Sequence, residues 1–212
     1  MPVATEKKAV SHETRIELPQ LKIQTMTLTL VGDSGLISHR WSEKAKKEML
    51  DKQMKKAKAA KEAKDPWRDY VDSLYWLSSK PAKVTPEDIR KARFGFPSIA
   101  FKTAAVDACS HVADITKVEA RGAFHIVGDM VEIDGKPTMR EDMVRIGMGT
   151  ADLRYRGEFK DWRAIIEVRY NVNVLSPEQI VNLFNTSGFA IGVGEWRPQK
   201  DGSFGMYHVL SE

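Results

Sequence analysis

Two stretches of the chain alternate apolar and polar residues so regularly that they constrain its fold more than any other feature. Residues 21–30 (LKIQTMTLTL) alternate almost perfectly and are rich in β-branched side chains. Residues 161–172 alternate again, with apolar residues from Trp162 to Tyr170 at every second position and Arg163, Glu167 and Arg169 among the residues between them. Such alternation is typical of half-buried strands. The sheet that contains them therefore has one face to bury against helices and one charged face.

A lysine-rich segment follows the first strand. Its composition predicts a helix over residues 42–64 that begins at the N-cap Ser42, and nine lysines lie between positions 44 and 64. The segment is either a solvated helix or partly disordered linker, or a basic arm that follows a phosphate backbone. Aromatic residues between positions 67 and 79 are expected to pack it back onto the body. Residues 42–80 are thus interpreted as a helical insertion.

Three more helices are predicted from their caps and composition. One begins at Thr85, which is followed by proline and two acids, and another covers residues 98–113. The last begins at the N-cap Ser176, continues through Pro177, and is expected to end at Gly188.

The order of these elements predicts an α+β fold. Short strands are expected over residues 123–127 and 130–133, so strands and helices follow one another as βαββαβ. In this ferredoxin-like arrangement, helices cover one face of a mostly antiparallel sheet. Residues 1–19 are mixed-charge without periodicity and are expected to form a flexible arm, which leaves residues 20–212 as a single domain.

The composition limits which cellular compartment and which class of binding partner we expect for the protein. The formal charge of +4 and the pI of about 9.0 suit a polyanionic partner. Cys109 is the single cysteine, which excludes an internal disulfide and favours a reducing, cytoplasmic compartment. The N-terminus lacks the apolar core of a signal peptide, and no run approaches the roughly 20 apolar residues that span a bilayer. No membrane partner is therefore expected.

Metal and cofactor chemistry find little support in the sequence. The histidines are scattered, with no paired-histidine motif, and Cys109 has no partner cysteine, so we expect no metal site. Residues 188–194 contain three glycines but lack the Gly-Lys-Ser/Thr ending of a phosphate loop. A serine-hydrolase elbow is absent as well, and no cofactor is expected.

Residues 188–207, here called the glycine-rich loop, contain five glycines together with Trp196, Arg197 and Lys200. Because glycine costs conformational entropy on folding, this density indicates positive φ angles or a close backbone approach. The loop follows a predicted helix and precedes a strand, which is the reverse of a nucleotide-binding turn.

Cationic and aromatic residues interleave along the chain, which is typical of proteins that bind single strands without strong sequence preference. The residues expected to contact nucleic acid are Arg40, Lys44, Lys47, Arg93, Phe96, Lys102, Arg154, Arg156, Trp196, Arg197 and Lys200. The alternative for each of them is an ordinary core or solvated role.

Two segments carry a family resemblance. Residues 96–104 (FPSIAFKTA) resemble the I-P-G-S-S-hydrophobic-K-G segment of the RAMP superfamily, the RNA-binding backbone subunits of CRISPR effector complexes. Residues 192–198 (GVGEWRP) and 202–205 (GSFG) are similar to the C-terminal glycine-rich loop of that superfamily. The resemblance implies an RRM-like core that lays a single strand over a protein filament, with Lys102 and Arg197 near the phosphates. The compact, lysine-rich style also resembles bacteriophage early-region proteins, which would place the protein in a bacterial host cell.

The first functional hypothesis is a non-enzymatic protein that binds single-stranded RNA or DNA and oligomerises head to tail along the strand. The second is a metal-independent endoribonuclease of the same superfamily, with His39 as general acid or base. His39 lies in the segment ISHRW between the first strand and the lysine-rich helix. The third is a phage structural or inhibitor protein whose glycine-rich loop contacts protein.

Overall fold

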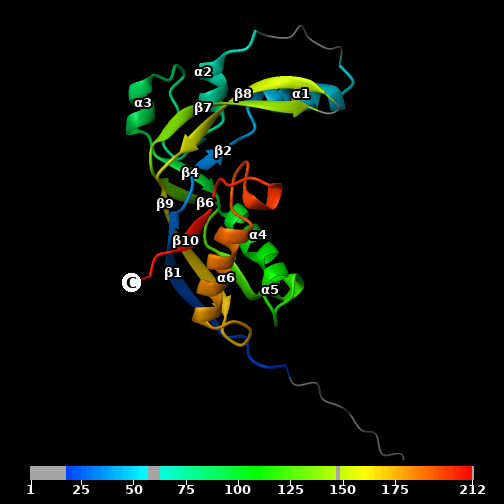
Figure 1. Ribbon diagram of the computed structural model, residues 1–212, viewed down its shortest axis with the longest axis vertical. Helices are drawn as coiled ribbons and strands as arrows, with labels where there is room; N and C mark the ends of the chain where they lie inside the picture. Colours follow the sequence, from blue (N-terminus) through cyan, green and yellow to red (C-terminus); the bar gives the residue numbers. More distant parts are fainter. Residues whose placement is uncertain (1–17, 57–62, 147–148, 212) are drawn as a thin grey trace, which may run out of the picture.

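The computed structural model describes residues 18–56, 63–146 and 149–211 (Figure 1). Almost all of the predicted arm at residues 1–19, and residues 57–62 near the end of the predicted lysine-rich helix, lie outside the described residues. The division into an arm and a single domain over residues 20–212 therefore stays a prediction.

A seven-stranded sheet forms the body of the described chain. Its strands are β1 (Ile23–Gly32), β3 (Tyr75–Trp76), β4 (Phe94–Pro97), β5 (Phe124–Ile126), β6 (Met130–Asp134), β9 (Arg163–Asn171) and β10 (Tyr207–Val209). β1 pairs with β9 on one side and β10 on the other, and β5 and β6 both pair with β9, all antiparallel. The order β10-β1-β9-β5 is that of a ferredoxin-like core, so the predicted α+β, ferredoxin-like fold is confirmed.

Three helices complete this core: α4 (Ser98–Ala108), α5 (Lys117–Ala123) and α6 (Pro177–Ala190). In Figure 1 they lie together beside β1, β9 and β10. The buried positions of β9 alternate with exposed ones along its whole length. Its Ile166 belongs with Phe101 of α4 and Phe184 of α6 to one buried core. The alternation noted in the sequence is thus the signature of a sheet covered on one face.

The cap of α6 was predicted correctly, and its end was not. Ser176 and Gln179 form a capping box, with Pro177 in the first turn. The helix, however, continues past Gly188 to Ala190. Gly188 is buried inside the helix where a Cβ atom would collide with the carbonyl of Tyr207. This glycine permits close helix–strand packing instead of ending the helix.

A second, three-stranded sheet was not predicted. It consists of β2 (Leu36–Ser38), β8 (Thr150–Phe159) and β7 (Pro137–Ile146), and β7 and β8 form a long hairpin. β7 carries charged residues on both faces and shows little alternation, whereas β8 alternates regularly, with Asp152, Arg154, Arg156 and Glu158 on one face. Gly157 of β8 receives Leu74 so closely that a Cβ atom there would collide with it.

The predicted insertion at residues 42–80 contains α1 (Glu43–Gln53) and α2 (Pro66–Asp72), and α3 (Pro86–Lys91) follows it. Ser42 caps α1 and Thr85 caps α3, as expected. The prediction of one helix over residues 42–64 is wrong, because α1 ends at Gln53 and Lys55 adopts a positive φ of 54°. In the described chain, no helix is both long and apolar enough to span a membrane.

The region after α4 also differs from the prediction. The predicted helix over residues 98–113 ends at Ala108 and continues only as a short 3-10 turn, Cys109–His111. Thr116 and Glu119 then form a capping box that begins α5, a helix missed in the sequence. β5 consequently starts at Phe124.

Candidate nucleic-acid interface

The glycine-rich loop is tied by its backbone to β2. The Glu195 amide donates to the carbonyl of Ile37 (3.1 Å), and the Gly205 amide donates to that of Gly35 (2.8 Å). Gly194 and Gly205 have φ angles of 81° and 66°. At both glycines a Cβ atom would clash with a backbone carbonyl, that of Ile37 or of Val193. These contacts confirm the close approach and positive φ angles that the glycine density predicted.

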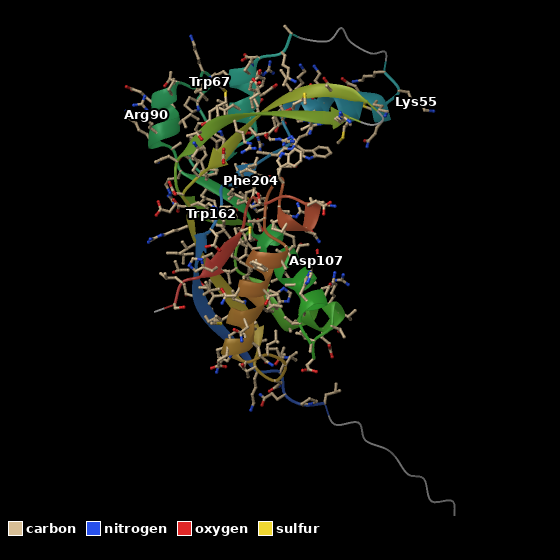
Figure 2. All side chains as sticks on the ribbon, in the orientation of Figure 1. Lys55, Trp67, Arg90, Asp107, Trp162 and Phe204 are labelled. Carbon is tan, nitrogen blue, oxygen red and sulfur yellow. The ribbon has the colours of Figure 1, made fainter. Side chains whose placement is uncertain are left out.

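This anchoring places the loop between the β7–β8 hairpin and the helices of the core (Figure 1). Phe204 lies beneath the hairpin in Figure 2, and the guanidinium of Arg140 on β7 is 4.3 Å from the centre of its ring. Such a cation–π contact adds to the attachment of the loop. The hairpin and the loop thereby form the two walls of a groove.

We call this groove the arginine groove. It has a volume of about 280 Å³ and is bordered by the exposed ring of Trp196 and by one carboxylate, that of Glu195. Five cationic residues also line it: Arg145, Arg154, Arg156, Arg197 and Lys200. Because the cations outnumber the carboxylate, the groove suits an anionic ligand.

Arg156 is the most deeply placed of these cations, with only 3% of the residue exposed. Its NH1 atom lies 3.5 Å from Asp142 Oδ2, and its NH2 atom lies 3.9 Å from Glu195 Oε2. Its Nε atom has no hydrogen-bond partner in the described chain. Burial lowers the pKa of the guanidinium, although the nearby carboxylates partly offset that effect. A buried guanidinium with an unmet donor would gain from an anion in the groove.

A second cavity lies on the other side of Arg197, and we call it the α4 groove. It has a volume of about 300 Å³. One wall is the face of α4 that carries Ile99, Thr103 and Asp107, and the other is the beginning of the glycine-rich loop. The two segments that carry the family resemblance therefore meet across this cavity.

Glu195 and Arg197 border both grooves. Glu195 Oε1 is 2.9 Å from Nδ1 of His39, which lines the α4 groove, while Oε2 faces Arg156 in the arginine groove. The hydrogen bond from His39 and the charge of Arg156 together hold the pKa of Glu195 below its usual range, against the effect of burial. The carboxylate is therefore ionised at neutral pH and connects the two grooves.

Arg197 is held by hydrogen bonds within its own segment. Its NH1 atom donates to the carbonyl of Gly194 (3.0 Å), and its Nε atom donates to Gln199 Oε1 (3.2 Å). Gln199 in turn donates from Nε2 to Asp107 Oδ2 (2.8 Å), which ties η2 (Pro198–Lys200) to α4. Figure 2 shows Asp107 beside this part of the chain. The arginine is thus fixed at the border of the grooves before any ligand arrives.

The structure brings together five of the residues predicted to contact nucleic acid, and all five line the arginine groove: Arg154, Arg156, Trp196, Arg197 and Lys200. His39, the alternative catalytic residue, lines the α4 groove. Arg145 was not among the predicted contacts. The glycines at positions 147 and 149 between two charged segments were the signal that could have placed Arg145 on one hairpin with Arg154.

The other predicted contacts lie elsewhere. Arg93 pairs with Glu132 on β6, and Arg40 pairs with Glu43 at the start of α1. Lys102 donates to the carbonyl of Arg121 (3.1 Å) and lies 2.9 Å from His125 Nδ1. Burial lowers the pKa of Lys102. None of these residues lines either groove.

The remaining residues that were predicted to contact nucleic acid are Phe96, Lys44 and Lys47. Phe96 is 6% exposed, packs edge-on against Phe101 and Tyr75, and lines the α4 groove, so its contact with a base stays a prediction. The ring belongs to the core because β4 is an interior strand of the sheet. Lys44 and Lys47 lie on α1, outside both grooves.

The open face of the sheet offers no stacking platform. Its positions on β1 and β9 carry Thr25, Thr27, Arg163, Ile165 and Arg169, while the aromatic residues of these strands are buried. RRM domains stack bases on aromatic side chains of this face. The core has the topology expected for an RRM-like protein without the aromatic surface.

Within the described ranges, no group of three or more histidine, cysteine, aspartate or glutamate residues is placed to hold a metal ion. No protein-family model matches the chain, and no curated protein matches its sequence. Among solved structures, the chain is similar to the crystal structure of Cmr6 from Pyrococcus furiosus. That alignment has 10% sequence identity and a TM-score of 0.44, and covers 90% of this chain and 100% of that chain. The fold assignment rests on the strand order and helix placement described above.

Proposed function

We propose that the protein binds single-stranded nucleic acid along the arginine groove. The observation that carries this proposal is the gathering of five cationic side chains and the exposed Trp196 around one groove. Cations hold the phosphates, and an exposed aromatic ring stacks on a base regardless of its identity. The groove thus supports binding with little dependence on sequence.

Trp196 is suited to the stacking role by its backbone. It is 41% exposed, and its φ angle of 54° is rare for a residue with a Cβ atom. The Trp196 carbonyl accepts a hydrogen bond from the Phe204 amide (3.0 Å), which helps to maintain this conformation. A ring held in place before binding loses less entropy when a base stacks on it.

The test is a titration of labelled single-stranded DNA and RNA at several salt concentrations. Arg154 and Lys200 are both replaced by alanine to remove two groove cations. Because each phosphate contact contributes about 0.7 to the salt slope for single strands, we expect the slope to fall by about 1.4. The matched control replaces Arg163 and Arg169, two cations on the open sheet face, and is expected to bind like the wild type. Unchanged binding after loss of Arg154 and Lys200 would refute the proposal.

We also propose that successive copies cover the strand head to tail. Support comes from α1, which buries none of its residues and exposes Met49 and Leu50, with Met54 exposed at its C-cap. Exposed apolar side chains on such a helix suit contact with the next copy. Light scattering after gel filtration, with and without a long oligonucleotide, measures the assembly. Binding of a single copy to a strand several times longer than its footprint would exclude head-to-tail assembly.

Metal-independent RNA cleavage is the second candidate function. It is favoured by the pairing of His39 with Glu195, since a carboxylate on Nδ1 fixes the tautomer and leaves Nε2 available as a base. In such a reaction, His39 removes the proton of a 2′-hydroxyl, which attacks the adjacent phosphorus. The 5′ oxygen leaves with a proton from water, giving a 2′,3′-cyclic phosphate and a 5′-hydroxyl.

Cleavage is tested with labelled RNA in EDTA. The control is His208, which also pairs with a carboxylate, Asp33, but lies outside both grooves. An enzyme would lose activity with His39→Ala and retain it with His208→Ala. Intact RNA in a shifted complex with the wild type would leave binding as the function.

A further inference from the structure

The α4 groove differs chemically from the arginine groove beside it. Ile99 and Ala100 of α4, together with Ile37 and Val193, give it apolar walls. Its polar groups include Thr103 and Asp107 of the same helix, together with His39, Glu195, Arg197 and Gln199. A volume of about 300 Å³ is at the small end of the range for ligand cavities. Such a cavity suits a flat heterocycle with a few hydrogen-bonding groups better than it suits a phosphate.

Asp107 provides a fixed acceptor in this cavity. Its side chain is 23% exposed, accepts from Lys117 Nζ (2.9 Å) at Oδ1, and accepts from Gln199 Nε2 (2.8 Å) at Oδ2. Burial raises the pKa of this carboxyl, but the bonds from Lys117 and Gln199 outweigh it, so the net shift is downward. Asp107 therefore stays ionised, and its remaining lone pairs can only accept hydrogen bonds.

The position of the cavity connects it to a bound strand. Arg197 borders both grooves, so a phosphate at Arg197 has the arginine groove on one side and the α4 groove on the other. Successive phosphates in the arginine groove would leave the base next to Arg197 free to enter the α4 groove. Thr103 lies one helical turn before Asp107 on the same face and offers a second hydrogen-bonding group.

We propose that the α4 groove takes one base of the bound strand and that Asp107 recognises its exocyclic amino group. The inference rests on the proposed function and adds a preference to it. Carboxylates in proteins accept hydrogen bonds from the N4 amine of cytosine. Uracil carries an oxygen at the same position, which an ionised carboxylate repels. The protein thus selects amino-bearing bases at one position while the rest of the strand is bound without sequence preference.

The experiment compares two oligonucleotides whose bases differ only at the C4 substituent and at N3, which carries a proton in uracil: a deoxycytidine homopolymer and a deoxyuridine homopolymer of equal length. Affinities are measured by fluorescence anisotropy at one salt concentration. Wild-type protein is expected to bind the cytosine strand about tenfold more tightly, the effect of one hydrogen bond to a charged group. With Asp107→Asn the preference should fall below about twofold, because an amide can also donate to the uracil oxygen.

Two further variants make the result decisive. Asp134→Asn makes the same chemical change at an exposed site of β6 outside both grooves and should keep the preference. Ala100→Trp fills the cavity and should lower the cytosine affinity to the uracil level even if Asp107→Asn disturbs folding. Tight and equal binding of both strands by the wild type would overturn base recognition and leave the proposed function intact. Failure to bind either strand would overturn both.

Discussion

The open face of the sheet and the arginine groove are both exposed surfaces with cations, yet they differ in origin and in chemistry. The sheet face belongs to the ferredoxin-like core and presents threonines with alternating charges, such as Glu167 next to Arg169. The arginine groove is formed by the β7–β8 hairpin and the glycine-rich loop, both additions to that core. Only the groove combines an excess of cations with an exposed aromatic ring.

This difference shows that a fold and its binding surface need not come from the same elements. The core supplies the rigid sheet and helices, while segments inserted between core elements supply the charged walls. Glu195 illustrates the connection, because its backbone is bonded to β2 and its side chain faces Arg156 on β8. Changes in the loop should therefore affect binding more than changes on the sheet.

The largest effect is expected from Gly205→Ala. Gly205 has a φ of 66°, and a Cβ atom would collide with the backbone of Val193, so the loop would have to detach from β2. We expect a loss of about 3 kcal/mol in stability and no measurable binding to single strands. Circular dichroism melts and anisotropy titrations check the two parts. Normal binding by this variant would place the ligand on the sheet face.

The matched control is Gly122→Ala. Gly122 lies in α5, and a Cβ atom there has no neighbour within 4 Å. Alanine should therefore stabilise the protein by about 1 kcal/mol without changing binding. A loss of stability would mean that the space beside Gly122 in α5 is occupied and not open.

An intermediate effect is expected from Trp196→Ala. Loss of one stacking ring should weaken single-strand binding by about 2 kcal/mol, or about 30-fold in Kd. Phe189 is an equally aromatic and more exposed residue on α6 that lines neither groove, and Phe189→Ala should leave Kd unchanged. If both variants bound single strands with the same Kd, stacking on Trp196 would not contribute to the affinity. Tryptophan fluorescence quenching by the bound strand gives an independent measure.

The smallest effect is a pH dependence of stability at Glu195. Its pKa in the folded protein lies below the ordinary value of 4.5, so its contribution is complete above pH 4.5 and is lost as the pH falls through the folded pKa. The groups that face it are His39, Arg156 and Arg154. Glu195→Gln should lower stability by at most about 1 kcal/mol at neutral pH, with the difference shrinking in acid. If the stability difference between Glu195→Gln and the wild type stayed constant down to pH 3, the stabilisation would not come from the ionised carboxylate.

Much of the core was predictable because its signals are local. The alternation of β1 and β9, the caps at Ser42, Thr85 and Ser176, and the tightness of the glycine-rich loop depend on residues close in sequence. The hairpin was missed although β8 alternates regularly, because its partner β7 carries charges on both faces and shows little alternation.

Individual site residues were harder to predict than the region that contains them. Arg154, Arg156, Trp196, Arg197 and Lys200 were expected to bind and do line one groove. Lys102 and Phe96 looked equally suitable in sequence. Lys102 faces α5, and Phe96 lies in the core at the wall of the α4 groove, because the direction of a side chain on a packed element is set by its partners.

The sequence by itself determined the two long core strands β1 and β9, the start of α6, and where the chain has to turn tightly. Only the tertiary structure decided which cations share a groove, since Arg154 and Arg197 are brought together by contacts between a hairpin and a distant loop. It also decided that Asp107 and Thr103 face a cavity. The physical reason is that backbone preferences act over a few residues, whereas a charged groove depends on packing between elements far apart in the chain.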